Sequence, residues 1–556
     1  MRLRRFWLGA FRNLRDVEIS FDPTPSLYGD ASIRFFVGLN GTGKSNALEA
    51  LGLIFSHLAI YASPGISFDL EYVRDARIIR IITPGTFPFT ALAEQLDLSI
   101  TDLANYRIPQ IDAVVLVRPS DVPTWQLDHI RDQWASSGDE LLPNRVIGYS
   151  SGPTSGLDYA LARSVDRLVR QRIGAFDADT PPAGYSNAEW KTYQEAQQAM
   201  RDQEREAYLD NPRTHFFGRD TALYAAVALL AHDGSADLSD EGRKTMLVER
   251  IGLDPTQPLV AFSLRVSGEW ETRLTGTRRD TFRRLLIRAT RRTKIDPPPG
   301  VPSTDDPPPP DFRAVYELDE TFRTSTIREI APTPFIFFEQ LLAWRRQGAL
   351  LGLNLILRKA QVADLLLESS LSDGEFLYLD RYAVLALLRD APNSLILLDE
   401  PETHFNDRWK SHLVRDIVDL LGANTDSTRR YDVVIATHSV LTLTDADPHQ
   451  VYRFRRDSLT NADGHLEMRT IVERLPISTF AADQNRVSRV ISEGDASIGD
   501  LAEQEVEQAL SGTSIKKVEE LLDLTGPGFA QFQLRDKLLD LRDAADANEV
   551  KSAPPK

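Results

Sequence analysis

The sequence predicts an α/β fold in which one mixed sheet with flanking helices is assembled from both ends of the chain. Near the N-terminus, short apolar stretches such as "RRFWLGAF", "DVEISF" and "IRFFVG" are separated by turn residues, which is typical of strands. An apolar run with helical periodicity, "SNALEALGLIFSHLA", follows directly. Farther along, residues 333–475 alternate apolar strands with helices, as parallel sheets do. The region between these parts differs in composition and is predicted to be a large, mainly helical insert.

The expected domain boundaries follow these changes in composition. Residues 1–120 and 331–475 would form the two parts of the sheet domain, and residues 121–330 would form the insert. Within the insert, the proline-rich stretch 296–312 is predicted to be a loop, because serial prolines cannot join a helix or a central strand. Residues 476–556 are predicted to be mainly helical, with a disordered end.

The composition narrows the class of protein. Of the 556 residues, 42% are hydrophobic and 26% are charged, which is ordinary for a globular protein. No apolar run approaches the ~18–20 residues that a membrane span needs, so no membrane contact is expected. Because there is no cysteine, disulfides and thiolate metal sites are excluded, and we expect a cytoplasmic location. The formal net charge of −17 repels nucleic acid at long range, so any DNA contact would need a local basic patch.

A phosphate-binding loop is predicted between the strand "IRFFVG" and the helical run that follows it. The stretch "FFVGLNGTGKSN" matches the pattern G-x-x-x-x-G-K-[ST] from Gly38 to Ser45. Gly38, Gly41 and Gly43 allow the backbone to turn several N–H groups toward an anion at a helix N-terminus. Lys44 would contact the β- and γ-phosphates of a nucleotide, and the hydroxyl of Ser45 would bind Mg²⁺. The alternative is a chance glycine-rich turn, and the motif alone leaves kinases, GTPases and ATPases open.

Two acidic residues are predicted at the carboxyl end of a buried strand. In "SLILLDEPETH", the apolar residues 395–398 precede Asp399 and Glu400, and ligands of open α/β sheets bind at this edge. Asp399 would hold Mg²⁺ through water, and Glu400 would orient and deprotonate the attacking water. A second strand, "YDVVIATHSV", ends beside His438, which could reach the γ-phosphate or that water. Alternatively, Asp399 and Glu400 could be solvated acids at a strand end, and His438 could have a purely structural role.

The order of these motifs resembles that of one family. The phosphate loop, "LSDGE", "LILLDE" and "VVIATHS" follow one another as in ABC-type ATPases, within the soluble branch that contains RecF, SMC proteins and OLD-like ATPases. "GLNGTGKSN" is similar to the phosphate loop of that branch, "AFRNLRDVEISF" to its opening strand pair, and "DEPETH" to the OLD-like form. The resemblance implies an ABC-type ATPase head that uses ATP and Mg²⁺. It also implies nucleotide-binding roles for further residues of these motifs, namely Arg12, Asn40, Thr42 and Asn46.

The resemblance also assigns a role to "LSDGE". In this family, the equivalent segment caps the γ-phosphate held by the phosphate loop of a second subunit, which implies a homodimer with two shared ATP sites. Here the capping groups would be Ser372 and the N–H of Gly374, at the start of a helix. Asp373 departs from the commoner Leu-Ser-Gly-Gly pattern and would place a carboxylate near phosphate unless it points away. "FND", which contains Asp407, departs from the usual "LHP" of OLD-like relatives.

The insert and the C-terminal region indicate which members of this branch the chain resembles most. The insert contains prolines and globular stretches in place of the long coiled coils of SMC proteins. "NRVIGYSSG", "LSDGE" and the helical tail resemble AAA-family ATPases found beside restriction and anti-phage genes. The OLD nuclease domain needs a glutamate followed by an Asp-x-Asp strand. Glu493 and Asp495 are present, but no such strand follows, so no intrinsic nuclease is expected.

These features predict a sensor or switch subunit of a defence system that acts through a separately encoded effector, such as a nuclease. The main alternative is a RecF-like ATPase that binds DNA in repair or genome maintenance. A scaffold that binds ATP but hardly hydrolyses it is a third possibility, against which the intact Glu400 argues.

One stretch of this acidic chain is strongly basic. "RLTGTRRDTFRRLLIRATRRTK" has apolar residues that fit one face of a helix, which would leave a broad cationic face able to neutralise DNA phosphates. The candidate DNA-binding residues are Arg279, Arg283, Arg284, Arg288, Arg291 and Arg292. A solvated or internally paired face is the alternative.

Overall fold

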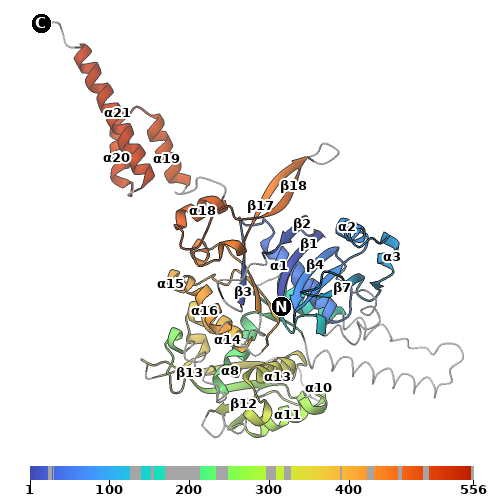
Figure 1. Ribbon diagram of the computed structural model, residues 1–556. Coiled ribbons are helices and arrows are strands. Elements are labelled where there is room, and N and C mark those ends of the chain that lie inside the picture. Colours follow the sequence, from blue (N-terminus) through green and yellow to red (C-terminus); the bar gives the residue numbers. More distant parts are fainter. Residues whose placement is uncertain are drawn as a thin grey trace, which may run out of the picture. The chain divides into compact units, whose positions relative to one another are not determined.

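The computed structural model divides the chain into two compact units, Met1–Ala482 and Asp483–Lys556 (Figure 1). It describes residues 1–22, 28, 31–125, 140–151, 156–168, 213–232, 248–295, 309–318, 327–362, 364–388, 391–421, 431–460, 466–492, 500–526 and 528–552. None of the helices among these residues is long and apolar enough to cross a membrane.

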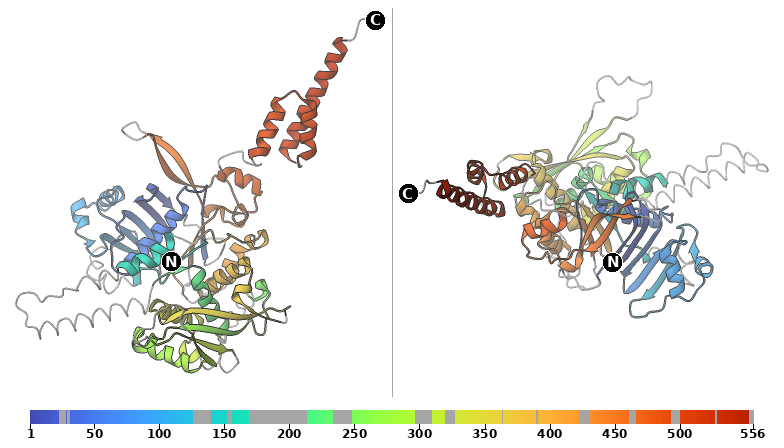
Figure 2. Two further views of the ribbon diagram at one scale, coloured as in Figure 1. Left: turned by 180° about the vertical axis from the view of Figure 1, so that it is seen from behind. Right: turned by 90° about the horizontal axis from the view of Figure 1, so that it is seen from above.

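The first unit contains a seven-stranded sheet in the order β18-β17-β3-β16-β15-β8-β9. The strands are β3 (Ala31–Val37), β8 (Val146–Ser150), β9 (Thr214–Phe217), β15 (Ser394–Asp399), β16 (Tyr431–Ala436), β17 (Val451–Thr460) and β18 (Leu466–Arg474). Neighbouring strands are parallel except β17 and β18, which form a long antiparallel hairpin (Figure 2). Because β3 lies between β16 and β17, the prediction of a mixed sheet built from both ends of the chain is confirmed.

The boundary expected at residue 121 does not coincide with the edge of this sheet. β8 and β9 fall inside the predicted insert, yet they pair with each other and with β15. Two helical turns after β8, α5 (Gly156–Asp158) and η1 (Tyr159–Arg163), pack against the first helix of the chain. β8 has five residues and β9 has four, so their apolar patterns are short. Such short patterns could not be assigned to a sheet whose other strands lie far away in the sequence.

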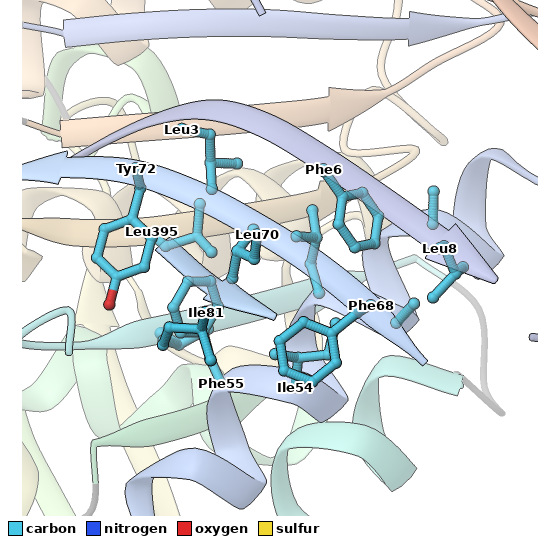
Figure 3. Close-up of a cluster of buried hydrophobic side chains, with 14 of the residues drawn as sticks. Leu3, Phe6, Leu8, Ile54, Phe55, Phe68, Leu70, Tyr72, Ile81 and Leu395 are labelled. Atoms are coloured by element: carbon cyan, nitrogen blue, oxygen red, sulfur yellow. The ribbon is translucent and has the colours of Figure 1, made fainter. Parts of the chain in front are cut away.

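A second sheet, which is antiparallel, covers the helix that follows the phosphate loop. Its order is β2-β1-β4-β5-β7-β6, from β1 (Arg2–Phe11), β2 (Leu14–Ser20), β4 (Phe68–Arg74), β5 (Arg77–Ile82), β6 (Arg107–Ile108) and β7 (Ala113–Pro119), with α2 (Phe87–Gln95) and α3 (Ile100–Ala104) before β6. Helix α1 (Lys44–Ala59) is almost wholly buried. Figure 3 shows Ile54 and Phe55 of α1 meeting Phe6, Leu70 and neighbouring side chains of this sheet. This apolar contact fixes the position of α1, and with it the loop at its N-terminus.

A third sheet joins strands of the predicted insert, residues 121–330, to strands that follow it, so the boundary expected at residue 330 does not coincide with the edge of this sheet either. Its order is β11-β12-β10-β13-β14, from β10 (Leu259–Val266), β11 (Arg291–Lys294), β12 (Phe312–Glu317), β13 (Leu350–Arg358) and β14 (Leu365–Leu367). Helices accompany it: α8 (Arg219–Ala231), α10 (Trp270–Arg273), α11 (Gly276–Ile287), α12 (Arg328–Ile330) and α13 (Pro334–Arg346). α8 and α13 pack on β13 (Figure 1). The described part of the insert is therefore mixed α and β rather than mainly helical.

The predicted proline-rich loop 296–312 is only partly described. Residues 296–308 lie outside the described residues, and Phe312 already begins β12. β12 alternates the buried Ala314 and Tyr316 with more exposed neighbours, as a strand with one covered face does. The alternation spans only six residues directly after the prolines, so it gave a weak strand signal.

A buried helix, α14 (Asp373–Leu388), begins at the "LSDGE" motif. It packs against α8, α13 and α16 (Leu413–Leu421). Short helical turns flank these elements: η3 (Glu368–Ser370), α15 (Asp407–Lys410), α17 (Val440–Leu443) and η4 (Pro448–Gln450). Residues 376 and 378–388 of α14 are all buried, whereas Ser372 and Asp373 at its start are exposed.

The carboxyl group of Asp380 in α14 is expected to make stability depend on pH. Its two oxygens are buried and have no hydrogen-bond partner in the described structure, and burial raises its pKa from 3.8 to about 7, with Arg381 opposing the change. Between those two pH values the folded protein binds a proton that the unfolded chain does not, so stability falls as the pH rises toward 7. We expect Asp380→Asn to be more stable than the wild type at pH 8, by up to about 4 kcal/mol.

Thermal unfolding measured from pH 5 to pH 8 checks this expectation. The difference between the two proteins should shrink as the pH falls, whereas the exposed control Asp121→Asn should unfold with the wild type throughout. A difference that does not change with pH would contradict the assigned titration.

The second unit is helical in its described part, as the sequence predicted for the C-terminal region. It contains α18 (Gln484–Ser492), α19 (Asp500–Ser511), α20 (Ile515–Leu524) and α21 (Phe529–Ser552). α19, α20 and α21 share a small apolar cluster that includes Val506, Val518 and Leu534. Glu493 and Asp495 lie outside the described residues, as does the end of the chain from residue 553, which was predicted to be disordered.

Candidate nucleotide-binding and catalytic site

The predicted phosphate loop forms the connection between β3 and α1. Gly38, Gly41 and Gly43 have φ values of 142°, 76° and 108°, which favour glycine. A Cβ atom on Gly38 would lie 2.1 Å from the carbonyl oxygen of Phe454 in β17, and one on Gly43 would lie 2.5 Å from Cδ2 of Leu14 in β2. The loop is therefore enclosed from two directions, and glycine is required at both positions.

Side chains of the loop bond mainly to its own backbone. Nζ of Lys44 donates to the carbonyl oxygens of Gly38 at 2.7 Å and Leu39 at 3.0 Å. The hydroxyl of Thr42 donates to the carbonyl oxygen of Leu39 at 2.8 Å, while Asn40 is exposed. Burial lowers the pKa of the Lys44 ammonium group, and nearby carboxylates oppose that change. The loop thus keeps a cation in its interior, where phosphate oxygens would be bound.

The turn between β1 and β2 contacts the loop. The amide of Asn13 donates to the carbonyl oxygen of Gly41 at 2.9 Å, and the amide of Asn46 donates to Oδ1 of Asn13 at 2.6 Å. Asn46 therefore supports this turn through Asn13. Arg12, in the same turn, forms an ion pair with Glu49 of α1 at 2.5 Å. Sequence reasoning included Arg12 and Asn46 but missed Glu49 and Asn13.

The β17–β18 hairpin supports the loop from another direction. Nη2 of Arg456 donates to the carbonyl oxygen of Gly41 at 2.7 Å. The hydroxyl of Thr470 donates to the carbonyl oxygen of Thr42 at 2.8 Å. Nothing in the sequence indicated these contacts, because they join segments from opposite ends of the chain.

Asp399 and Ser45 meet at the carboxyl edge of the sheet. The hydroxyl of Ser45 donates to Oδ1 of Asp399 at 2.8 Å, and the hydroxyl of Ser150, at the end of β8, lies 3.5 Å from Oδ2. Burial raises the pKa of Asp399 to about 6, against the lowering effect of the Ser45 hydrogen bond. Hydroxyl and carboxylate oxygens are the ligands that Mg²⁺ prefers, so these residues fit a magnesium ion.

Glu400 follows Asp399 in a conformation that is rare for residues other than glycine. Its φ is 48°, and its N–H donates to the carbonyl oxygen of Ala436 at 2.8 Å. Nδ1 of His438, at the tip of β16, lies 3.3 Å from Oε1 of Glu400. Both side chains are partly exposed, at 33% for Glu400 and 56% for His438. The turn holds the carboxylate and the imidazole together at the open edge of the sheet, where such backbone strain is often found at functional sites.

Glu402 is a buried carboxylate that sequence reasoning missed. Its Oε1 accepts a hydrogen bond from the hydroxyl of Thr437, which in turn accepts one from the N–H of Ser439 at 2.9 Å. Burial raises the pKa of Glu402, and the Thr437 hydrogen bond opposes the change. Glu402 therefore ties the segment after β15 to the segment after β16. In the sequence, Glu402 could have been noticed as the third acidic residue of "DEPET".

These residues surround a cavity of about 340 Å³. Its walls are Arg12, Ser45, Asn46, Glu49, Ser150, Ser151, Gly156, Leu157, Asp399 and Glu400. The structure thus brings together the predicted Arg12, Ser45, Asn46, Asp399 and Glu400, and Lys44 directly precedes Ser45 in the chain. The "LSDGE" motif contributes no residue to these walls.

The "LSDGE" motif forms the N-terminal cap of α14. The hydroxyl of Ser372 accepts a hydrogen bond from the N–H of Glu375 at 3.3 Å and donates to the Glu375 carboxylate at 2.9 Å. The pKa of Glu375 is lowered because hydrogen bonds from Lys359 and Ser372 outweigh the effect of burial. A Cβ atom on Gly374 would lie 2.9 Å from the ring of Trp409, so the helix start is closely packed.

Asp373 lines two cavities of about 520 and 810 Å³ that also contain Arg345 of α13. Neither cavity includes a residue of the phosphate loop. Asp373 is thus next to the lobe of α8 and α13, which also contributes Leu223, Tyr224 and Arg345 to these cavities.

The basic stretch is not one continuous helix. α11 ends at Ile287, and Arg291 and Arg292 lie on strand β11, because the chain turns after Arg288 to join the third sheet. Several of these arginines already form ion pairs or hydrogen bonds within the chain. Arg283 pairs with Glu271 and Asp280, Arg288 pairs with Glu329, and Arg292 donates to the carbonyl oxygen of Leu286. Arg279, Arg284 and Arg291 are exposed without an ion pair in the described structure.

Comparison with protein families finds a match in the middle and later part of the chain. Residues 193–444 match the family described as "AAA domain, putative AbiEii toxin, Type IV TA system". The matched region begins after the phosphate loop and contains α14, the acidic end of β15 and the tip of β16. No curated protein matches the chain.

Solved structures with similarity to this chain include SMC head domains. One is the SMC head domain from Thermotoga maritima, at 10% identity over 86% of this chain and 100% of that one, with a TM-score of 0.30. Another is the Smc head domain with a coiled coil and joint from Pyrococcus yayanosii, at 13% identity over 88% and 99%, with a TM-score of 0.28. A third, from Pyrococcus furiosus and bound to the C-terminal domain of ScpA, has 14% identity over 85% and 96%, with a TM-score of 0.26. At these scores the fold assignment rests on the strand order and the motif positions.

Proposed function

We propose that this chain, a P-loop ATPase with the ABC-type fold, hydrolyses ATP in two sites shared between two copies of itself. The observation that supports this most directly is the contact between Ser45 and Asp399 at 2.8 Å, with Glu400 beside it at the open carboxyl edge of the sheet. A hydroxyl at the start of the helix after a phosphate loop, next to two strand-end carboxylates, is the arrangement that nucleotide hydrolysis needs.

Each residue of the site has a separate role in the proposed reaction. The N–H groups of the loop and Lys44 bind the phosphates, and Ser45 and Asp399 would hold Mg²⁺, which neutralises phosphate charge when bound. Glu400 accepts a proton from a water molecule as the water oxygen attacks the γ-phosphorus and the bond to the bridging oxygen of ADP breaks. His438, 3.3 Å from Glu400, orients this carboxylate or the transferred phosphate.

The second copy would supply Ser372 and the N–H of Gly374. Both belong to the N-terminal cap of α14, and the N–H groups at a helix start favour an anion. Since neither residue lines the cavity beside the chain's own phosphate loop, a symmetric pair of copies is the arrangement in which they could reach a nucleotide. ATP would join the two copies, and hydrolysis would release them.

The biological role that we propose is a switch in an anti-phage or restriction-associated system of the cytoplasm, with a separately encoded effector such as a nuclease. The match to a family described by an AbiEii toxin and a type IV toxin–antitoxin system supports this context. In such a system, the joined and separated states of the ATPase would control the effector. The insert would provide the surface that detects the trigger or docks the partner.

A RecF-like role on DNA is the second candidate, and the three exposed arginines of α11 and β11 favour it. Steady-state ATP hydrolysis with and without linear duplex DNA separates the two. Stimulation by DNA would favour the clamp or DNA sensor, and hydrolysis indifferent to DNA would favour a defence switch that awaits another trigger.

Reversing the charge of Arg279, Arg284 and Arg291 to Glu is expected to weaken DNA binding if this surface is used. Each lost phosphate contact should reduce the salt dependence of the binding constant by about 0.9 in log–log slope. The matched control reverses Arg486, Lys516 and Arg535, which are exposed in the second unit and change the net charge equally. Binding titrations at several salt concentrations that show equal loss in both variants would mean that only net charge matters.

A further inference from the structure

Glu49 lies on the face of α1 that carries the site. It is four residues after Ser45, so both side chains project on one side of the helix, and both line the 340 Å³ cavity. The carboxylate is buried, with only 4% of its side chain exposed. An acid at this depth is costly without a partner, and burial does raise the pKa of Glu49, against the effect of Arg12. Its position therefore needs an explanation.

Two neighbours fix this carboxylate. Nη2 of Arg12 lies 2.5 Å from Oε1 of Glu49. On the other side, a Cβ atom on Gly156 would lie 2.0 Å from Oε2 of Glu49, so any side chain at position 156 would displace the acid. The Glu49 carboxylate is thus enclosed between Arg12, which contacts Oε1, and Gly156, whose missing side chain leaves room for Oε2.

The guanidinium of Arg12 is bound by Glu49 on one side, and about half of the Arg12 side chain is exposed. It occupies the turn between β1 and β2 with a φ of 50°, and the next residue, Asn13, donates to the phosphate loop at Gly41. Of the five guanidinium N–H groups, the hydrogen bond to Glu49 uses one on Nη2, and 51% of the side chain is exposed. Arg12 and Ser45 line the same cavity.

We propose that Glu49 is a positioning residue that holds the guanidinium of Arg12 toward the phosphates of the bound nucleotide. This inference rests on the proposed function, because it assumes that ATP occupies this loop. A free arginine would have to lose its rotamer freedom on binding, and the ion pair with Glu49 removes that cost before the nucleotide arrives. Glu49 itself touches neither the nucleotide nor the attacking water.

A double-mutant cycle tests the proposal. The Kd for Mg²⁺·ATP would be measured by equilibrium dialysis for Arg12→Ala, Glu49→Ala and the double variant, all with Glu400→Gln to prevent hydrolysis. We expect each single variant to weaken binding about three- to tenfold, and the double variant to be no weaker than Arg12→Ala alone. Glu49→Gln, which keeps the acceptor oxygen, should lie between the wild type and Glu49→Ala.

The possible outcomes are distinct. Multiplying effects in the double variant, or a loss in Glu49→Ala without one in Arg12→Ala, would overturn the positioning role. A shift in the Mg²⁺ requirement on Glu49→Gln that Arg12→Ala does not share would also overturn it, since Glu49 would then act on the metal. Thermal unfolding of each variant identifies a misfolded protein, in which case Glu49→Gln provides the decisive comparison. Normal ATP binding by Lys44→Ala would instead reject the proposed function itself.

Discussion

Glu400→Gln is expected to reduce ATP hydrolysis by about 10²- to 10⁴-fold while leaving ATP binding intact. Glutamine has nearly the same shape as glutamate and can still accept a hydrogen bond, but it cannot take a proton from water. The phosphate loop, Ser45 and Asp399 are unchanged, so the nucleotide should bind as before. Phosphate release by the purified variant and dialysis with labelled ATP measure the two properties separately.

The same variant should accumulate as a dimer in the presence of ATP. If ATP joins two copies and hydrolysis separates them, the block at Glu400 keeps them joined, and light scattering coupled to gel filtration would detect the larger species. Asp407→Asn serves as the matched control, because it makes the same carboxylate-to-amide change at an exposed position of the same segment. Hydrolysis at the wild-type rate by Glu400→Gln would show that another group is the base.

Lys44→Ala and Ser372→Arg should each abolish hydrolysis alone, yet regain it when the two variants are mixed. Lys44→Ala removes the cation inside the phosphate loop, and Ser372→Arg places a bulky side chain at the capping position of α14. In a mixed dimer, one of the two shared sites combines an intact loop with an intact cap. Random pairing should then restore about a quarter of the wild-type rate.

Recovery on mixing distinguishes shared sites from sites that lie within one chain. If Ser372 acted on its own chain's nucleotide, no mixture could contain a complete site, and the rate would stay near zero. Mixing Lys44→Ala with Glu400→Gln is the control, because these changes lie on the same side of a shared site. In that mixed dimer each site keeps one defect, so no recovery is expected.

The parts of the site that the sequence predicted are those in which chemistry and local structure coincide. Gly38 to Ser45 specify a loop between a strand and a helix by their own conformational needs, and Asp399 follows an apolar strand directly. The family resemblance placed Ser372 at a helix start, and the structure shows that its hydroxyl caps the helix at Glu375, three residues later.

The parts that were missed depend on contacts between distant segments. Glu49 reads as one polar residue in an apolar helix, and only its contact with Arg12 distinguishes it. The strands of the third sheet inside the predicted insert, β10 and β12, were missed because they are joined through stretches whose prolines and charges dominate the local pattern. Arg291 was assigned to a helix because the turn after Arg288 has no glycine or proline to mark it.

The position of β3 between β16 and β17 has a consequence for synthesis on the ribosome. The phosphate loop is translated early, but both strands that flank β3 are made near the end of the first unit, and β17 also supplies the carbonyl oxygen that closes on Gly38. Until then, β3 has two unpaired edges, which in a nascent chain invite incorrect pairing. The nucleotide-binding motif is therefore among the first parts of this unit to be translated and among the last to acquire its folded form.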